Sequence, residues 1–132
     1  MNDNWQWVAL LTEDEDDYAY WQYGFGCWAA HLRVEWFATG DAFFARPGLI
    51  EGKPSVLLLD GLIPMNEEPA WLNKILEHEC CQVLPIIMLA GEFMDGQQQG
   101  YLNLGAAECM IKPTNQHDLQ RAILSVSRYV TV

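Results

Sequence analysis

The chain has 132 residues, a net charge of −11 and 51% hydrophobic residues. This hydrophobic content is enough to bury a core and excludes a disordered chain, and the acidic surface excludes nucleic acids and anionic membranes as expected partners. We expect a single domain over residues 1–132, with a core over about 7–130 and no room for an output domain.

The first half of the chain alternates short apolar runs with helical patterns. Val8–Leu11 is apolar on both faces, as is typical of a buried parallel strand. The elements expected after it are a helix over Tyr18–His31, a strand over Leu32–Ala38, a short helix over Ala42–Ala45 with Gly40-Asp41 as its turn and N-cap, and a buried strand over Val56–Leu59 that ends at Asp60.

The second half repeats this alternation. The expected elements are a helix over Ala70–Cys80, a strand over Ile86–Leu89, a helix over Asp95–Leu104, a strand over Cys109–Ile111 and a last helix that starts at Asn115. The apolar stripe of the last helix consists of Leu119, Ala122, Ile123 and Val126. Five β–α units in succession predict a parallel sheet covered by helices on both faces.

Charged residues stand at three of the predicted strand ends. Glu13 and Asp14 follow the first strand, Asp60 ends the third, and Lys112 follows the fifth. Because the carboxyl ends of parallel strands share one edge of the sheet, these side chains can converge. Carboxylates suit Mg²⁺ and can attack phosphorus, and a lysine offers a charge for phosphoryl oxygens. The set therefore predicts a site for phosphoryl chemistry.

Several segments together resemble the bacterial response-regulator receiver family over about residues 7–130. They are Val56–Asp60 with Pro64, Leu84–Glu92, Gly105-Ala106 and Lys112-Pro113. The resemblance implies a flavodoxin-like (βα)5 three-layer sandwich, with a five-stranded parallel sheet in the strand order 2-1-3-4-5. It also implies a stand-alone signalling receiver of a two-component system, not a conventional enzyme, that takes a phosphoryl group from a histidine kinase or a histidine phosphotransfer protein.

The resemblance also implies roles for individual residues. Asp60 matches the phosphoacceptor, and Lys112 matches the lysine that contacts the acyl phosphate. Mg²⁺ is expected to be held by Glu13, Asp14 and Asp60, together with the backbone carbonyl of Leu62.

The sequence departs from the family pattern at three positions. An ungapped match puts Thr12 and Glu13 at the acidic pair, and we prefer the one-residue shift to Glu13 and Asp14 because it keeps two acids. Ala90 lacks the hydroxyl of the switch position, and Cys109 lacks the aromatic ring that swings inward. We therefore expect phosphorylation with altered coupling to the face of the fourth and fifth strands; an ordinary NMR shift of that face on phosphorylation would refute this hypothesis.

Two other functions stay open. A degenerate receiver that only binds protein partners is favoured by Ala90 and Cys109 and opposed by the retained acids and Lys112. A phosphohydrolase of the haloacid-dehalogenase type is disfavoured, because Leu62 stands where that family has its second aspartate. Receivers often dimerise through the face of the fourth and fifth strands and helices, so a homodimer is a further expectation; the downstream target is not specified.

The remaining residues suggest ordinary roles. Pro113 matches a family position that often follows a cis bond, and Glu15–Asp17 read as a solvated helix start. The cysteines are Cys27, Cys80, Cys81 and Cys109, and the histidines are His31, His78 and His117. We expect reduced, mostly buried thiols in a cytoplasmic protein, with a redox-active adjacent pair as the alternative, and no histidine paired with a cysteine.

Overall fold

The computed structural model describes residues 6–60 and 68–130. Their strands form one parallel sheet in the order β2-β1-β3-β4-β5. The strands are β1 (Trp7–Leu11), β2 (Arg33–Phe37), β3 (Val56–Asp60), β4 (Ile86–Ala90) and β5 (Glu108–Ile111). The helices are α1 (Glu15–Trp28), α2 (Gly40–Phe44), α3 (Glu68–Glu77), α4 (Gln97–Leu104) and α5 (Gln116–Ser127). The predicted flavodoxin-like sandwich and its strand order are confirmed.

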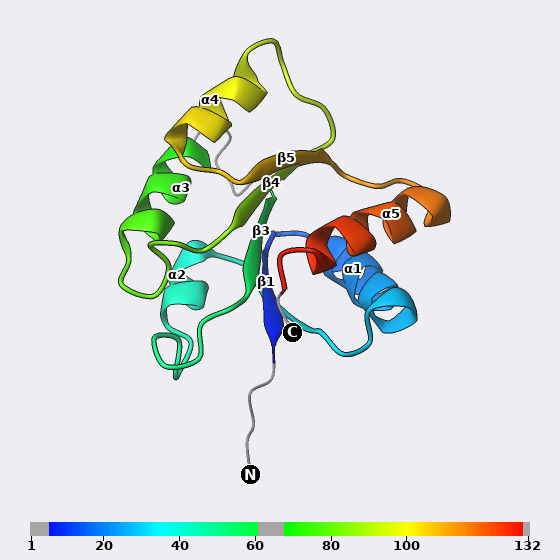
Figure 1. Cartoon of the computed structure of the whole chain (residues 1–132), viewed down its shortest axis with the longest axis horizontal. Coiled ribbons are helices and arrows are strands. Elements are labelled where there is room, and N and C mark those ends of the chain that lie inside the picture. Colours follow the sequence, from blue (N-terminus) through cyan, green and yellow to red (C-terminus); the bar gives the residue numbers. More distant parts are fainter. Residues whose placement is uncertain (1–5, 61–67, 131–132) are drawn as a thin grey trace.

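Helices cover both faces of the sheet. Helices α1 and α5 lie side by side on one face, and α2, α3 and α4 lie on the other (Figure 1). Every residue of β1 and β3 is buried, because these central strands have helices above and below them. Alternate strand residues therefore feed two apolar cores, one containing Val8, Leu10 and Leu58 and the other Ala9, Leu11 and Leu59.

Four helices start at residues other than those predicted. Helices α3 and α4 begin at Glu68 and Gln97 instead of Ala70 and Asp95, and the starts of α1 and α2 are set by their caps. Helix α1 begins at Glu15 instead of Tyr18, because the side chain of Asp14 accepts a hydrogen bond from the backbone N–H of Asp16 and caps the helix. Helix α2 is capped by Thr39 instead of Asp41, since Thr39 Oγ1 accepts a hydrogen bond from the N–H of Ala42 at 3.0 Å.

Helix α2 lies very close to α3. A Cβ atom added at Gly40 would lie only 2.1 Å from Cζ3 of Trp71, so only glycine fits here without moving the indole. Phe44 at the other end of α2 also stacks on Trp71, with ring centroids 6.3 Å apart. The two helices therefore share one aromatic contact surface.

The turn between α3 and β4 corrects three predictions. Helix α3 ends at Glu77, before the predicted end at Cys80, and a disulfide joins Cys80 to Cys81. The expected reduced state is therefore wrong for this pair, whose side chains the turn directs into one buried apolar layer. His78 Nδ1 accepts a hydrogen bond from the N–H of Cys80 at 3.1 Å, so the expected separation of histidines from cysteines is also wrong.

The two other cysteines are free, but Cys27 is exposed and Cys109 is half-buried, which corrects the expectation of mostly buried thiols for Cys27. Among the described residues, every helix falls short of the length and apolar character that a bilayer crossing requires.

Candidate functional site

The carboxyl ends of β1, β3 and β5 meet at one edge of the sheet. Asp60 is the last residue of β3, and Thr12 prolongs β1 because its N–H donates to the carbonyl of Phe37 at 3.1 Å. Lys112 prolongs β5 in the same way, with its N–H 2.8 Å from the carbonyl oxygen of Ala90. The backbone hydrogen bonds between the strands thus fix the Cα positions of Thr12, Asp60 and Lys112 at this edge.

The side chains converge on one oxygen of Asp60. Lys112 Nζ donates to Asp60 Oδ2 at 3.1 Å, and Thr12 Oγ1 donates to the same oxygen at 3.2 Å. Asp60 is only 6% exposed, so the ammonium group and the hydroxyl replace much of its hydration. The predicted convergence of Asp60 and Lys112 is observed, and their chemical roles stay predictions.

Asp17 is a further member of the cluster that the sequence did not suggest. Its Oδ2 accepts from Lys112 Nζ at 3.1 Å, so one ammonium group bridges the carboxylates of Asp17 and Asp60. The expectation of a solvated Asp17 is therefore wrong, because its side chain is only 24% exposed. The available signal was its spacing: Asp17 stands three residues after the N-cap Asp14, on the same side of the helix start.

The predicted acidic pair lies beside this cluster. Glu13 and Asp14 are both exposed, and the carboxylate of Asp14 is engaged as the N-cap of α1. The N–H of Asp14 donates to Thr12 Oγ1 at 3.2 Å, so Thr12 links the helix cap to Asp60. The residue in direct contact with Asp60 is therefore that of the ungapped match, and metal binding by Glu13 and Asp14 stays a prediction.

The remaining predicted residues surround the cluster. Leu62, expected to offer a backbone carbonyl, lies outside the described residues. Ala90 is paired with Ile111 in the β4–β5 register, and its side chain brings no hydroxyl to the strand ends. Cys109 packs against the core on the α4 side, where its thiol lies 3.8 Å from the carbonyl oxygen of Gln98.

Burial and charge act in opposite directions on the two aspartates. Burial, with the adjacent Asp17, raises the pKa of Asp60 to about 6, although Lys112 opposes the rise. Burial also raises the pKa of Asp17, but hydrogen bonds with Asp60 and Lys112 outweigh it, so the pKa of Asp17 lies below its ordinary value. Asp17 therefore ionises at a lower pH than Asp60 and is the first of the two to neutralise the Lys112 ammonium group. Ionisation of the Asp60 carboxyl costs more free energy.

The donor atoms of the cluster fit a hard divalent cation. Asp17, Asp60 and Thr12 offer only oxygen atoms, and Mg²⁺ is commonly held by one or two carboxylates with several waters retained. Glu13 and Asp14 add further carboxylates at the exposed rim. The Lys112 ammonium already lies between the buried carboxylate of Asp60 and the half-buried carboxylate of Asp17, so a bound cation would share them with it.

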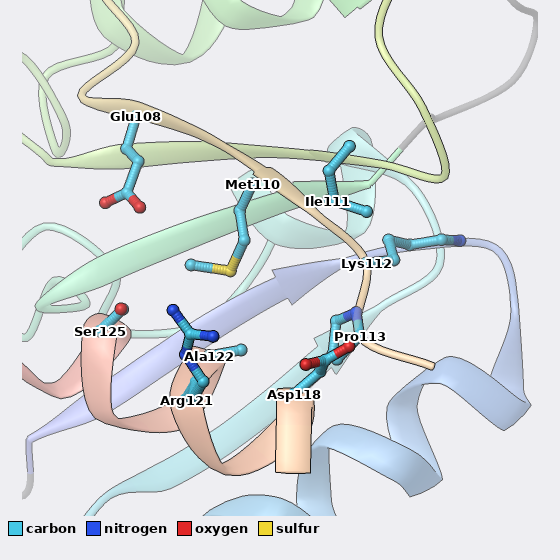
Figure 2. Close-up of a pocket in the computed structure, with 9 residues that line it drawn as sticks. All are labelled: Glu108, Met110, Ile111, Lys112, Pro113, Asp118, Arg121, Ala122 and Ser125. Atoms are coloured by element: carbon cyan, nitrogen blue, oxygen red, sulfur yellow. The ribbon is translucent and has the colours of Figure 1, made fainter. Parts of the chain in front are cut away.

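A hollow of about 320 Å³ adjoins Lys112 between β5 and α5. Figure 2 shows Met110 pointing into the space between the strand and the helix, whereas the amino group of Lys112 extends away from it. Pro113 lines this hollow together with Arg121 of α5. The Asp60 cluster and the hollow therefore meet at Lys112 and are otherwise separate.

Comparison with known proteins identifies the fold. No protein-family model and no curated protein sequence matches the chain. Solved structures match it over nearly its whole length. A response regulator from Thermotoga maritima has a TM-score of 0.77 at 14% identity, covering 95% of this chain and 97% of that one. The chemotaxis response regulator CheY4 of Vibrio cholerae has a TM-score of 0.73 at 19% identity, covering 92% and 98%.

A response regulator in red light signalling of R. palustris is similar in the same way, with a TM-score of 0.74 at 19% identity and 92% of each chain covered. A further neighbour is the signal receiver domain of a DNA-binding response regulator from Colwellia psychrerythraea, with a TM-score of 0.74 at 17% identity, covering 93% of this chain and 98% of that one. The chain therefore has the fold of response-regulator receiver domains.

Proposed function

We propose that the chain is a signalling receiver in which Asp60 accepts a phosphoryl group from a phosphohistidine of a histidine kinase or phosphotransfer protein. The observation that carries the proposal is the buried Asp60 carboxylate at the end of β3, held 3.1 Å from the ammonium group of Lys112. The receiver fold supports it, because an open parallel sheet places its reactive groups at the carboxyl ends of its strands.

The reaction is a transfer between two nucleophiles. An oxygen of the Asp60 carboxylate attacks phosphorus, the P–N bond breaks, and its electron pair returns to the imidazole nitrogen of the donor. The product is an acyl phosphate on Asp60. Lys112 stabilises the charge on the phosphoryl oxygens, since it is a fixed cation within hydrogen-bonding distance of the attacking carboxylate.

Mg²⁺ would be held by Asp60 and Asp17, with Glu13, Asp14 and the carbonyl of Leu62 as the further ligands that the family resemblance implies. When bound, the cation neutralises negative charge on the transferred group. Thr12 orients the Asp60 carboxylate through its hydroxyl, which leaves the second carboxylate oxygen for the attack.

The experiment that tests the proposal uses a small phosphodonor. The full chain is incubated with acetyl phosphate and Mg²⁺, and intact-mass measurement is expected to show the addition of one phosphoryl group. Asp60→Asn should abolish the addition, and the exposed Asp95→Asn should leave it unchanged. Omission of Mg²⁺ should also suppress it.

A second function is favoured by a specific observation. Thr12 contacts Asp60 at the position where the ungapped family match expects an acid. The ammonium group of Lys112 is already hydrogen-bonded to the carboxylate of Asp17. These contacts suit a degenerate receiver that binds protein partners without phosphorylation. The test is whether the folded wild type accepts a phosphoryl group from acetyl phosphate, or binds beryllofluoride, at Asp60. If it does neither, the role of Asp60 as phosphoacceptor is contradicted, and the function as a protein-interaction module is supported instead.

Cation binding has its own reporter in Trp36. Its indole Nε1 donates to the carbonyl of Thr12 at 2.8 Å, and its ring stacks on Tyr18 with centroids 5.4 Å apart. A Mg²⁺ titration is expected to change the tryptophan fluorescence, and Trp36→Phe should remove the change. Asp17→Asn should move the midpoint to higher Mg²⁺ concentration, because one of the two carboxylates in contact with Lys112 loses its charge.

The matched control is Trp28→Phe, since Trp28 lies at the opposite end of α1 from Asp17. A Mg²⁺ response that survives Trp36→Phe, or one whose midpoint is the same in Asp17→Asn, would count against a cation at this cluster.

A further inference from the structure

The α3–β4 turn gathers three potential metal ligands at the amino edge of the sheet, away from Asp60. One ligand atom each of His78, Cys80 and Cys81 lies within 4.8 Å of the other two, the one such group among the described residues. Cys80 and Cys81 are 2% and 0% exposed, whereas His78 is half-buried and reaches the surface. The cluster therefore has a shielded sulfur side and an open imidazole side.

The backbone of the turn holds these residues in place. The N–H of Cys81 donates to the carbonyl of His78 at 2.9 Å, and the N–H of Leu84 donates to the carbonyl of Cys81 at 3.2 Å. The turn thus closes back on the His78 carbonyl and continues into β4. Both cysteine side chains enter the apolar core beneath α2 and α3.

Two contacts orient the imidazole ring of His78. Its Nδ1 accepts a hydrogen bond from the N–H of Cys80 at 3.1 Å, so its lone pair faces the cysteine segment, and a bound cation would replace the Cys80 N–H as the partner of this nitrogen. The ring also stacks on Phe44 of α2, with centroids 4.6 Å apart and planes 22° apart. A neutral imidazole with a directed lone pair is the form that binds metals.

We propose that Cys80, Cys81 and His78 form a redox-gated site for one thiophilic divalent cation of the Zn²⁺ class. In the oxidised state the sulfurs are bonded to each other, so neither is a thiolate donor. A dithiol reductant opens the site: it gives two electrons and two protons to the disulfide, the S–S bond breaks, two thiols form, and the reductant becomes a cyclic disulfide.

Cation binding then displaces the two thiol protons. Zn²⁺ bonds are about 2.3 Å to sulfur and about 2.0 Å to nitrogen, so the ligands of one tetrahedral ion lie roughly 3.5 Å apart. The ligand atoms of the cluster already lie within 4.8 Å of one another, and opening the disulfide frees the two sulfurs to move apart to this spacing. A water completes the coordination at the half-buried His78 side. The exposed carboxylates of Glu77 and Glu79, which flank His78 in the sequence, favour the approach of a cation.

The test uses the full chain in both redox states, with Co²⁺ as a spectroscopic probe. Protein reduced with a phosphine, which becomes its oxide by taking oxygen from water, is expected to bind one Co²⁺ per chain. Binding should give thiolate-to-cobalt charge transfer in the near ultraviolet and the visible bands of a tetrahedral ion. Zn²⁺ should displace the Co²⁺ and remove both signals. Oxidised protein should show neither, and this comparison needs no substitution that could unfold the chain.

Variants identify the ligands. Cys80→Ser, Cys81→Ser and His78→Gln should each weaken or remove the signal, whereas Cys27→Ser and Cys109→Ser should retain it, because both of those cysteines are free and lie outside the turn. Circular dichroism of each variant verifies its fold. The proposal is overturned by a folded, reduced wild type that gives no thiolate–cobalt band, by an oxidised protein that gives the same band, or by loss of the band in Cys27→Ser or Cys109→Ser.

Discussion

The carboxylate of Asp60 is buried at a cost that its neighbours offset only in part. Lys112 provides the opposite charge at 3.1 Å, but Asp17 claims the same ammonium group. Burial therefore dominates and raises the pKa of Asp60 to about 6. The native state holds a proton on Asp60 more tightly than the unfolded chain does, so ionisation of Asp60 lowers the stability of the fold.

Asp60→Asn is expected to stabilise the protein above neutral pH, because it removes the buried charge and keeps an oxygen acceptor for Thr12. The gain should be roughly 1 to 3 kcal/mol at a pH well above 6. Since the folded pKa is raised, this gain should shrink as the pH falls through about 6, where the wild-type carboxyl becomes neutral as well. Urea unfolding of both proteins across this pH range measures it.

The control for this prediction is Asp95→Asn, which changes an exposed carboxylate. The difference in the free energy of unfolding between Asp95→Asn and the wild type should not change as the pH passes through about 6. A stabilisation by Asp60→Asn that grows on acidification would have the wrong sign and would contradict the assignment of the raised pKa to Asp60.

The sequence predicted part of this cluster. Asp60 and Lys112 were identifiable because each follows a buried apolar run, and parallel topology then brings their positions to one edge. Thr12 was identified only as the less favoured, ungapped match, and Asp17 was not identified, because their roles depend on contacts across 48 and 95 residues of sequence. A threonine after a strand and the last acid of an acidic run have ordinary solvated roles in most sequences, so residue type alone does not reveal them.

At the scale of elements, strands were predicted better than helix ends. A strand buried on both faces is a continuous apolar run with clear limits, and β3 and β4 lie within one residue of their predicted bounds. Helix ends depend on which side chain caps them, and Asp14 and Thr39 compete with neighbouring residues that cap equally well. The end of α3 was missed because the turn at His78 has no glycine or proline to mark it.

Gly40→Ala is expected to destabilise the protein by roughly 1 to 3 kcal/mol, because the added Cβ meets the Trp71 ring at 2.1 Å. The matched control is Gly26→Ala in α1, where a Cβ meets nothing within 4 Å. That change should stabilise the protein by about 0.5 to 1 kcal/mol, because alanine loses less conformational entropy in a helix. Thermal unfolding of the two variants tests both signs. Equal effects at the two positions would argue against a close α2–α3 contact.

At the scale of the whole molecule, the charge is strongly unbalanced. The chain has 18 acidic and 7 basic side chains, so repulsion among its carboxylates opposes the compact state. The described ion pairs use few of the bases: Arg46 pairs with Glu35, and Lys112 serves two aspartates. Most of the negative charge is therefore balanced only by dissolved ions.

Added salt is accordingly expected to stabilise the fold. The urea midpoint should rise between about 20 mM and about 300 mM NaCl, because the Debye length falls from roughly 20 Å to well under 10 Å. The slope of the transition should stay constant, since the surface exposed on unfolding does not change. A midpoint that falls with salt would instead indicate that attractive ion pairs dominate the charge balance.

The pairing of α1 with α5 has a consequence for synthesis of the chain. Trp21 and Phe25 of α1 are buried, and a Cβ at Gly24 would meet the α5 side chains Leu119 and Ile123 at 3.0 Å. Helix α1 is thus covered by a helix that is synthesised much later. A nascent chain must keep the apolar face of α1 exposed until α5 emerges from the ribosome, and in that interval it is a natural client for a chaperone.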